Sequence, residues 1–290
     1  MTSLFVVEPG PLTLVQDQGR PALAHLGVGA SGAMDRAALD LANRLVGNAA
    51  DAAGLEILFG GLAVRPTSAV WVATAGAWGR VAIDGNEIPP HTATLVSAGA
   101  TLSFDSATHG IRYYLAIRGG VAVPPVLGSR SRDSLAHLGP VALTAGDSVP
   151  LGAEPASVVP PNDLIPFTPP ATSTVTLGVR PGPRRDWFTE GSWEKLFSEE
   201  WRVSPRSDRS GVRLEGVALS RVHSRELPSE GMLPGAIQVS PDGAPTILAV
   251  DHPVTGGYPV IAVVTDESLD ALAQLRPGQP ISFRLATGRS

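Results

Sequence analysis

Several polar clusters in this sequence lie among glycines and contain residue types that could bind or activate a small substrate. The first, residues 16–20, reads Gln-Asp-Gln-Gly-Arg and falls in a predicted turn. Arg20 could hold a carboxylate or an amide, because a guanidinium group forms paired hydrogen bonds to planar oxygen acceptors, and Asp17 could orient the bound group. An Asp17–Arg20 ion pair that only fixes the turn explains the same residues equally well.

A second cluster, residues 31–35, reads Ser-Gly-Ala-Met-Asp and opens a helix predicted over residues 34–46. The free N–H groups of a first helical turn could hold an anionic ligand there. Ordinary N-capping by the Ser31 side chain explains the same residues, and we favour it. The helix would carry Asp35 in its first turn and have Gly47 available for a left-handed C-cap.

A third cluster contains Arg209 and Arg213, which are four residues apart and lie beside Asp208. In a loop, the two guanidinium groups could clamp a phosphate or a carboxylate. In a strand, they would face the same side and pair with Asp208 or Glu215. The sequence leaves both interpretations open.

A fourth cluster, residues 251–259, follows a strongly apolar predicted strand. Its glycines, Gly256 and Gly257, would let the backbone approach a ligand closely. A tight turn in which Tyr258 covers the end of a barrel is the favoured alternative. Gln238, in the same half of the chain, adds an amide that could contact a substrate.

The composition excludes several familiar chemistries. The chain has no cysteine, and its six histidines show no HxH or HExxH spacing, so we predict neither thiol chemistry nor a metal site. Lys195 is the only lysine, which leaves no Walker lysine and no setting for covalently attached biotin. Ser31 lacks the second glycine of a nucleophile elbow, since Ala33 stands there, so a serine hydrolase triad is not expected.

Charge and hydropathy define the expected surroundings of the protein. The formal net charge of −5 leaves no general basic surface, so neither nucleic acid nor an anionic membrane is an expected partner. No apolar run approaches the roughly 20 residues that span a bilayer, and the N-terminal segment lacks the basic region of a signal peptide. We therefore expect a cytoplasmic location.

Glycines and prolines divide the chain into short segments typical of a mainly β protein built from barrels or sandwiches. Asp84 and Gly85 form the predicted turn of one hairpin. Besides the helix over 34–46, we predict a helical segment over 186–201, which Gly191 divides into two short helices or breaks as one helix, and a helix over 266–275. Predicted strands cover residues 69–74, 94–96, 113–117, 175–179, 246–250 and 260–265.

The proline-rich residues 155–174 show neither a helical nor an alternating pattern, so they predict a semi-rigid linker. This linker would separate an N-terminal domain over residues 1–154 from a C-terminal domain over residues 175–290. Each predicted domain is rich in strands and contains at least one helix.

Ten short motifs occur in a fixed order along the chain, and their order is more specific than any one of them. They lie at residues 16–20, 27–35, 42–48, 115–120, 127–131, 181–188, 207–209, 230–231, 235–239 and 255–259. Together they resemble the allophanate hydrolase subunit 2 family of biotin-dependent carboxyltransferases, which includes KipA-type proteins and the C component of 5-oxoprolinase. The resemblance implies tandem cyclophilin-like β-barrel domains.

The resemblance also implies a subunit that is active only with partners. The leading activity is ATP-dependent 5-oxoprolinase, which opens 5-oxo-L-proline to L-glutamate with a KipI-type (allophanate hydrolase subunit 1) partner and a third subunit. The ATP could be bound by a partner. The alternatives are an allophanate hydrolase or urea carboxylase-type carboxyltransferase subunit, and a regulatory module that binds a KipI-type kinase inhibitor.

Small amide and ureido substrates suit arginines, glycine N–H groups and acids, because these stabilise oxyanion charge and move a proton. We therefore expect the matched clusters to line a cleft. The candidate catalytic residues are Asp17, Arg20, Asp208 and Asp251, and the candidate substrate-binding residues are Gln16, Ser31, Asp35, Arg209, Arg213, Gln238, Thr255, Gly256, Gly257 and Tyr258.

One departure from the family pattern affects the substrate assignment. Where the family commonly has Arg-Gln-Thr after the aspartate of the last motif, this chain has His252, Pro253 and Val254. Ser210 stands where a methionine is common. These changes leave the exact substrate open and favour a specialised or regulatory paralogue.

Overall fold

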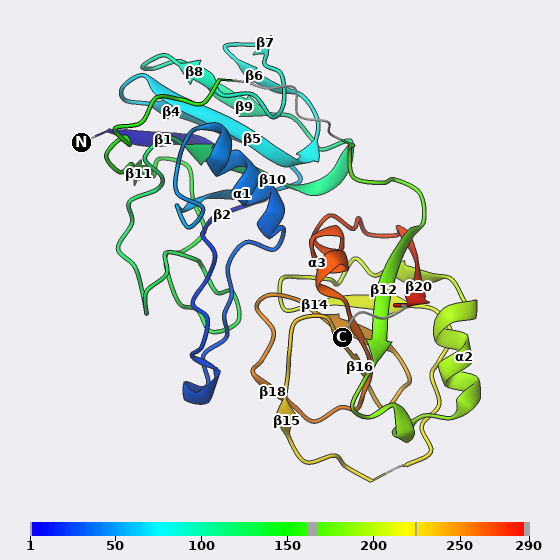
Figure 1. The fold of residues 1–290 in the computed structure, drawn as a ribbon. Coiled ribbons are helices and arrows are strands. Elements are labelled where there is room, and N and C mark those ends of the chain that lie inside the picture. The colour runs from blue at the N-terminus through cyan, green and yellow to red at the C-terminus, as the bar shows by residue number, and fades with distance from the viewer. Residues whose placement is uncertain (1, 162–167, 224, 287–290) are drawn as a thin grey trace. The chain divides into compact units, whose positions relative to one another are not determined.

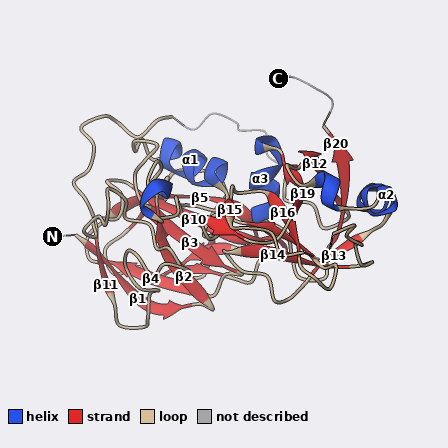
Figure 2. Cartoon of the chain, turned by 90° about the horizontal axis from the view of Figure 1, so that it is seen from below, coloured by secondary structure: helices blue, strands red, loops and turns tan. Residues whose placement is uncertain are grey.

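The computed structural model describes residues 2–161, 168–223 and 225–286, and its contacts divide the chain into two compact units (Figure 1). Most of its ordered elements are strands, as predicted (Figure 2). The first unit comprises Met1–Arg20, Ser31–Asp133 and His137–Pro170, and the second comprises Pro21–Ala30, Ser134–Ala136 and Ala171–Ser290.

The sequence did not indicate that two short segments of the first half would belong to the second unit. One of them contains the 3₁₀ helix η1 (Ala24–Leu26). The predicted domain limits at residues 154 and 175 stay predictions, and residues 162–167 of the predicted linker lie outside the described residues.

The strands of the first unit form two antiparallel sheets. The six-stranded sheet has the order β11-β1-β4-β9-β6-β7, and the five-stranded sheet has the order β2-β3-β10-β5-β8. The bounds in the first sheet are β11 Ser148–Pro150, β1 Ser3–Pro9, β4 Leu62–Pro66, β9 Leu102–Phe104, β6 Val81–Ile83 and β7 Asn86–Glu87. Those in the second are β2 Leu12–Gln16, β3 Gly54–Leu58, β10 His109–Ile117, β5 Val70–Trp78 and β8 Thr94–Val96.

The central strand β10 is buried on both faces, which explains the continuous apolar run over residues 113–117. Tyr113, Leu115 and Ile117 point into the main core with apolar side chains from both sheets. Tyr114 and Ala116 point to the opposite face, where they pack in a second core with the helix α1 (Arg36–Leu45). Figure 1 shows α1 lying against β5 and β10. Alternate side chains of one strand thus support two cores.

The start of α1 corrects one prediction, and its end confirms another. Asp35, not Ser31, is the N-cap, because the Asp35 side chain accepts a hydrogen bond from the Ala38 N–H (2.9 Å). Asp35 therefore precedes the helix and does not lie in its first turn. Ser31 instead has a left-handed backbone (φ 54°). Gly47 follows the C-cap in a left-handed conformation (φ 69°), as predicted.

The second unit contains a closed barrel with the strand order β12-β19-β16-β17-β14-β13-β20. The pairing of β12 with β20 is parallel, and the other pairings in the ring are antiparallel. The bounds are β12 Val175–Pro181, β19 Val260–Val264, β16 Ala236–Val239, β17 Pro245–Leu248, β14 Gly211–Glu215, β13 Trp201–Val203 and β20 Pro280–Leu285. A two-stranded sheet of β15 (Glu230–Gly231) and β18 (Thr255–Gly256) accompanies the barrel.

The segment predicted over 186–201 forms two short helices, one of the two alternatives, although the division is not at Gly191. A 3₁₀ helix, η2 (Arg185–Trp187), is followed by α2 (Glu190–Ser198), whose N-cap Thr189 accepts from the Ser192 N–H. Gly191 lies inside α2, so the predicted break there is wrong. The third helix, α3 (Asp266–Ala273), and the hairpin turn at Asp84 and Gly85 are confirmed.

We predict that Gly216→Ala destabilises the second unit. A Cβ on Gly216 would lie 2.7 Å from Cε3 of the fully buried Trp201 ring. The free energy of unfolding should fall by about 1–3 kcal/mol in urea denaturation, because an overpacked core must shift. Gly191→Ala is the control, since nothing lies within 4 Å of a Cβ there and alanine favours the helix. Equal losses in both variants would contradict the close approach at Trp201.

Candidate functional site

The carboxylate of Asp17 is the centre of a hydrogen-bond network in the first unit. Its Oδ1 accepts from the hydroxyls of Ser129 (2.6 Å) and Ser131 (2.5 Å). The backbone N–H groups of Gly19 (2.8 Å) and Arg130 (2.6 Å) donate to Oδ1 and Oδ2, respectively. The residue is only 6% exposed, so these donors replace the water that a carboxylate would otherwise bind. Asp17 therefore holds the serine-bearing loop in place.

This loop begins with a strained turn. Val126 and Ser129 exchange both backbone hydrogen bonds (2.8 and 3.2 Å), while Leu127 (φ 52°) and Gly128 (φ 83°) are both left-handed. Two left-handed residues between paired strands are typical of a type I′ turn. A leucine in this conformation costs on the order of 1 kcal/mol, so the contacts around the turn must stabilise it.

Three predicted site residues bind the backbone carbonyls that follow. Arg20 Nη2 donates to the Ser131 carbonyl (2.5 Å), while Gln16 Nε2 (2.9 Å) and Ser31 Oγ (3.2 Å) both donate to the Arg132 carbonyl. The structure thus brings Gln16, Arg20 and Ser31 together with the Asp17 network. No Asp17–Arg20 ion pair forms among the described residues, so the serines fix the turn instead.

Two buried atoms of this group have no hydrogen-bond partner among the described residues, namely Gln16 Oε1 and Arg20 Nη1. The two side chains are 0% and 2% exposed. An unpaired buried polar group costs on the order of 1–3 kcal/mol, so such atoms are rare in folded proteins. The group therefore offers one free acceptor and one free donor.

A second network, not predicted from the sequence, lies beneath the start of α1. Glu56 Oε2 accepts from the Tyr114 hydroxyl (2.7 Å) and from the Met34 N–H (3.1 Å), and the Tyr114 oxygen accepts from the Asp35 N–H (2.8 Å). Arg112 Nε lies 3.6 Å from Glu56 Oε1. Burial, reinforced by the charges of Glu56 and Asp35, raises the pKa of Tyr114 well above its ordinary value. The neutral hydroxyl is thereby held as a donor to Glu56.

In the second unit, Arg209 and Asp251 form a buried bidentate ion pair. Arg209 Nε lies 2.9 Å from Oδ2 and Nη2 lies 3.0 Å from Oδ1 of Asp251. Ser134 adds its N–H (2.9 Å) and its hydroxyl (2.7 Å) to the same Oδ2. The two charged side chains are 3% and 0% exposed, so the paired geometry compensates for their desolvation.

Asp208 and Arg213 lie in surroundings unlike those of Arg209. Asp208 Oδ1 accepts from the N–H groups of Ser210 (2.7 Å) and Gly211 (3.1 Å), which makes a local turn. Arg213 is exposed on β14, and its Nε donates to the Arg206 carbonyl (3.3 Å). The two arginines therefore do not form the clamp considered above, and they do not face the same side.

The last predicted group surrounds β18. Thr255 and Gly256 form that strand, and the Nε2 of Gln238 donates to the Tyr258 carbonyl (3.2 Å). A Cβ on Gly256 would lie 2.5 Å from the same Gln238 nitrogen, so this close approach requires glycine. Gly257 and the 47%-exposed Tyr258 line a pocket.

Comparison with known proteins defines the family of the chain. The family described as "Carboxyltransferase domain, subdomain A and B" matches residues 26–285. The chain belongs to this carboxyltransferase family. It is 37% identical to the C component of 5-oxoprolinase from Escherichia coli (strain K12) over 97% of the chain and 90% of that protein.

Larger proteins contain the same carboxyltransferase fold. Urea amidolyase of Saccharomyces cerevisiae is 36% identical over 97% of this chain, which spans 16% of that protein. The crystal structure of K. lactis urea amidolyase matches with a TM-score of 0.91 and 32% identity, and here the chain covers 19% of that protein. The chain therefore spans about a fifth or less of these urea-processing relatives.

The chain has no lysine in the setting of a P-loop. The only lysine of this carboxyltransferase-family chain, Lys195, is exposed on α2 and follows no glycine-rich loop. No group of three or more histidine or acidic residues that could hold a metal ion occurs in the described ranges. In the same ranges, no helix is long and apolar enough to cross a membrane.

The partners of Asp17 were not predicted from the sequence. Ser129, Arg130 and Ser131 were recognised only as part of a family motif. The alternation of two serines around an arginine, directly after Leu127 and Gly128, was the available signal. It gave no indication that both hydroxyls converge on a carboxylate more than 100 residues earlier in the chain.

We predict that the stability of the first unit depends on Tyr114 at high pH. Folding raises the pKa of Tyr114, so the neutral hydroxyl stabilises the folded state. This stabilisation is fully present below the pKa of an unfolded-state tyrosine, about 10, and is lost as the pH rises from there through the folded-state pKa. Tyr114→Phe should lower the free energy of unfolding by about 1–3 kcal/mol at neutral pH and should flatten its alkaline decline.

Denaturant unfolding across the pH range, with tyrosinate absorbance recorded in parallel, measures both effects. Tyr258→Phe is the matched control because the Tyr258 side chain is 47% exposed. An alkaline decline as steep in Tyr114→Phe as in the wild type would exclude Tyr114 as its source.

Proposed function

We propose that this chain is a subunit of a heteromeric, ATP-dependent enzyme that opens 5-oxo-L-proline to L-glutamate. The observation that carries the proposal is its 37% identity to the C component of E. coli 5-oxoprolinase, which extends over 90% of that protein. Other subunits of the complex, including a KipI-type partner, would supply the ATP site, since Lys195 and its surroundings do not fit one.

The Asp17 network supports an amide substrate. An amide presents a carbonyl acceptor and an N–H donor, which complement the unpaired donor Arg20 Nη1 and the unpaired acceptor Gln16 Oε1. Both side chains are anchored on consecutive carbonyls, those of Ser131 and Arg132, so the free atoms belong to one rigid group. Because both atoms are shielded from solvent, substrate access requires movement of the residues that cover them.

We assign different roles to the residues of this network. Arg20 would bind and polarise the amide carbonyl, and a guanidinium at this position would stabilise negative charge that develops on the oxygen. Asp17 would act as a positioning residue, because its oxygens are already occupied by the loop that Arg20 holds. Hydrolysis adds water across the amide C–N bond and yields a carboxylate and an amine.

A urea-type activity is the second candidate. Urea and its carboxylated form also carry a carbonyl acceptor beside N–H donors, so the same pair of free atoms would suit them. The specific observation in favour is the TM-score of 0.91 with K. lactis urea amidolyase.

The function is tested by ATP-dependent glutamate release from 5-oxo-L-proline. The assay contains this chain, its co-expressed KipI-type partner and the third subunit, with each component omitted in turn. We expect release that requires this chain. Turnover of urea instead would favour the second candidate, and a stable complex that turns over neither substrate would refute both.

We predict that Arg20→Lys lowers kcat/KM by about tenfold or more, because lysine keeps the charge and loses the second donor of the fork. Arg202→Lys on β13 is the matched control, since Arg202 is exposed and pairs with Glu200 at the surface. Circular dichroism checks that both variants fold. Unchanged kcat/KM in a folded Arg20→Lys complex would remove Arg20 from the site.

A further inference from the structure

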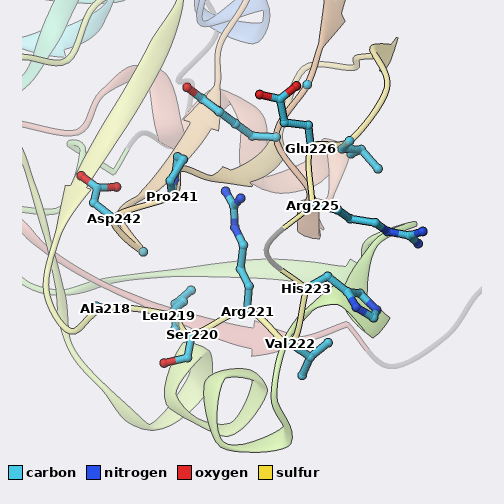
Figure 3. A pocket seen from close by; sticks show the side chains of 14 residues that line it. Ala218, Leu219, Ser220, Arg221, Val222, His223, Arg225, Glu226, Pro241 and Asp242 are labelled. Carbon is cyan, nitrogen blue, oxygen red and sulfur yellow. The ribbon is translucent and has the colours of Figure 1, made fainter.

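The second unit contains a pocket of about 900 Å³ whose lining includes no residue of the Asp17 network (Figure 3). Its walls come from residues 218–223 and 225–227, the turn over 241–243, and residues 257–258. Figure 3 shows Arg221 extending into the middle of these side chains, with Pro241 and Asp242 on one side and Arg225 on the other. The pocket is therefore built around a guanidinium group.

Arg221 is held firmly yet lacks a charged partner among the described residues. Its Nη2 donates to the Val239 carbonyl, and its guanidinium carbon lies 5.8 Å from the centre of the Tyr258 ring. Its Nε is buried and has no hydrogen-bond partner in the same ranges. Burial lowers the pKa of Arg221, while Tyr258 and Asp242 act in the opposite direction. A partly buried cation with a free donor is a favourable position for an anion.

Four other arginines of this unit are already paired with acids. Arg184, Arg185, Arg202 and Arg209 each form an ion pair with a carboxylate. In the part of the chain that the structure describes, neither Arg221 nor Arg225 forms one. Arg225 instead lies 5.3 Å above the Trp187 ring. Two cations of one pocket are therefore available to an external anion.

The acids of the pocket restrict the charge of that anion. Asp242 is occupied by its own turn, since its Oδ1 accepts from the Ser240 hydroxyl and from the Ala244 N–H (3.2 Å). Glu226 is exposed and makes no ion pair within the described ranges. Two arginines and two acids leave the lining without net charge, which disfavours a dianionic phosphate and suits a ligand that carries both signs.

We propose that this pocket binds a small zwitterionic carboxylate of the amino-acid class. Its carboxylate accepts from Arg221 Nε once the groups that bury this nitrogen move aside, and its ammonium group lies toward the carboxylate of Glu226. The exposed ring of Tyr258 covers the ligand side chain. The inference does not rest on the proposed enzymatic activity, because it concerns binding by this chain alone.

The test is isothermal titration of the full chain with three probes: L-glutamate, glutarate and inorganic phosphate. Glutarate has the carboxylates of glutamate and lacks its ammonium group. We expect L-glutamate to bind most tightly, and Arg221→Gln to weaken it about tenfold or more, as loss of a charged hydrogen bond requires. Glu226→Gln should remove most of the preference for L-glutamate over glutarate.

Arg202→Gln is the matched control, since it removes an arginine of the same unit outside the pocket and should leave the affinity unchanged. If Arg221→Gln does not fold, Arg221→Lys replaces it, and circular dichroism checks its fold. Arg221→Lys also lacks Nε, so it should bind L-glutamate more weakly than the wild type does. The assignment is overturned if no probe binds, if phosphate binds most tightly, or if a folded Arg221 variant keeps wild-type affinity.

Discussion

The need to solvate one buried carboxylate organises the candidate site of the first unit. Asp17 cannot be buried without donors, and two serine hydroxyls and two backbone N–H groups supply them. Those contacts hold a turn in which a leucine has a positive φ, and the loop that follows presents the carbonyls that anchor Gln16 and Arg20. Removing the carboxylate would therefore loosen both the turn and the two side chains that depend on it.

Much of the fold was predictable because it depends on local rules. The apolar periodicity of α1, the left-handed Gly47 and the Asp84-Gly85 hairpin are properties of short segments. Capping was harder, because Ser31 and Asp35 have similar capping propensity and only the path of the chain before the helix decides between them. Gly191 appeared to break a helix, yet Thr189 caps α2 and leaves the glycine inside it.

The candidate site was predictable in part. Gln16, Asp17, Arg20 and Ser31 were recognised as one region because the first three are close in sequence and the resemblance included Ser31. Their partners were not, because Ser129 and Ser131 lie more than 100 residues from Asp17 in the sequence and meet it only in the folded chain. The network of Glu56 and Tyr114 was also missed. Alternation within β10 determines that Tyr114 faces α1, but the sequence does not show that Glu56 lies beside its hydroxyl.

The closure of the barrel has a consequence for how the second unit is synthesised. β12 and β20 pair in parallel, and Thr176 and Ser282 hydrogen bond across this seam although they are 106 residues apart in the sequence. Until β20 emerges from the ribosome, β12 and β13 each keep an exposed edge capable of pairing with other chains. The nascent barrel is thus open to aggregation until nearly all of the unit has been made, a period in which a chaperone would be of most use.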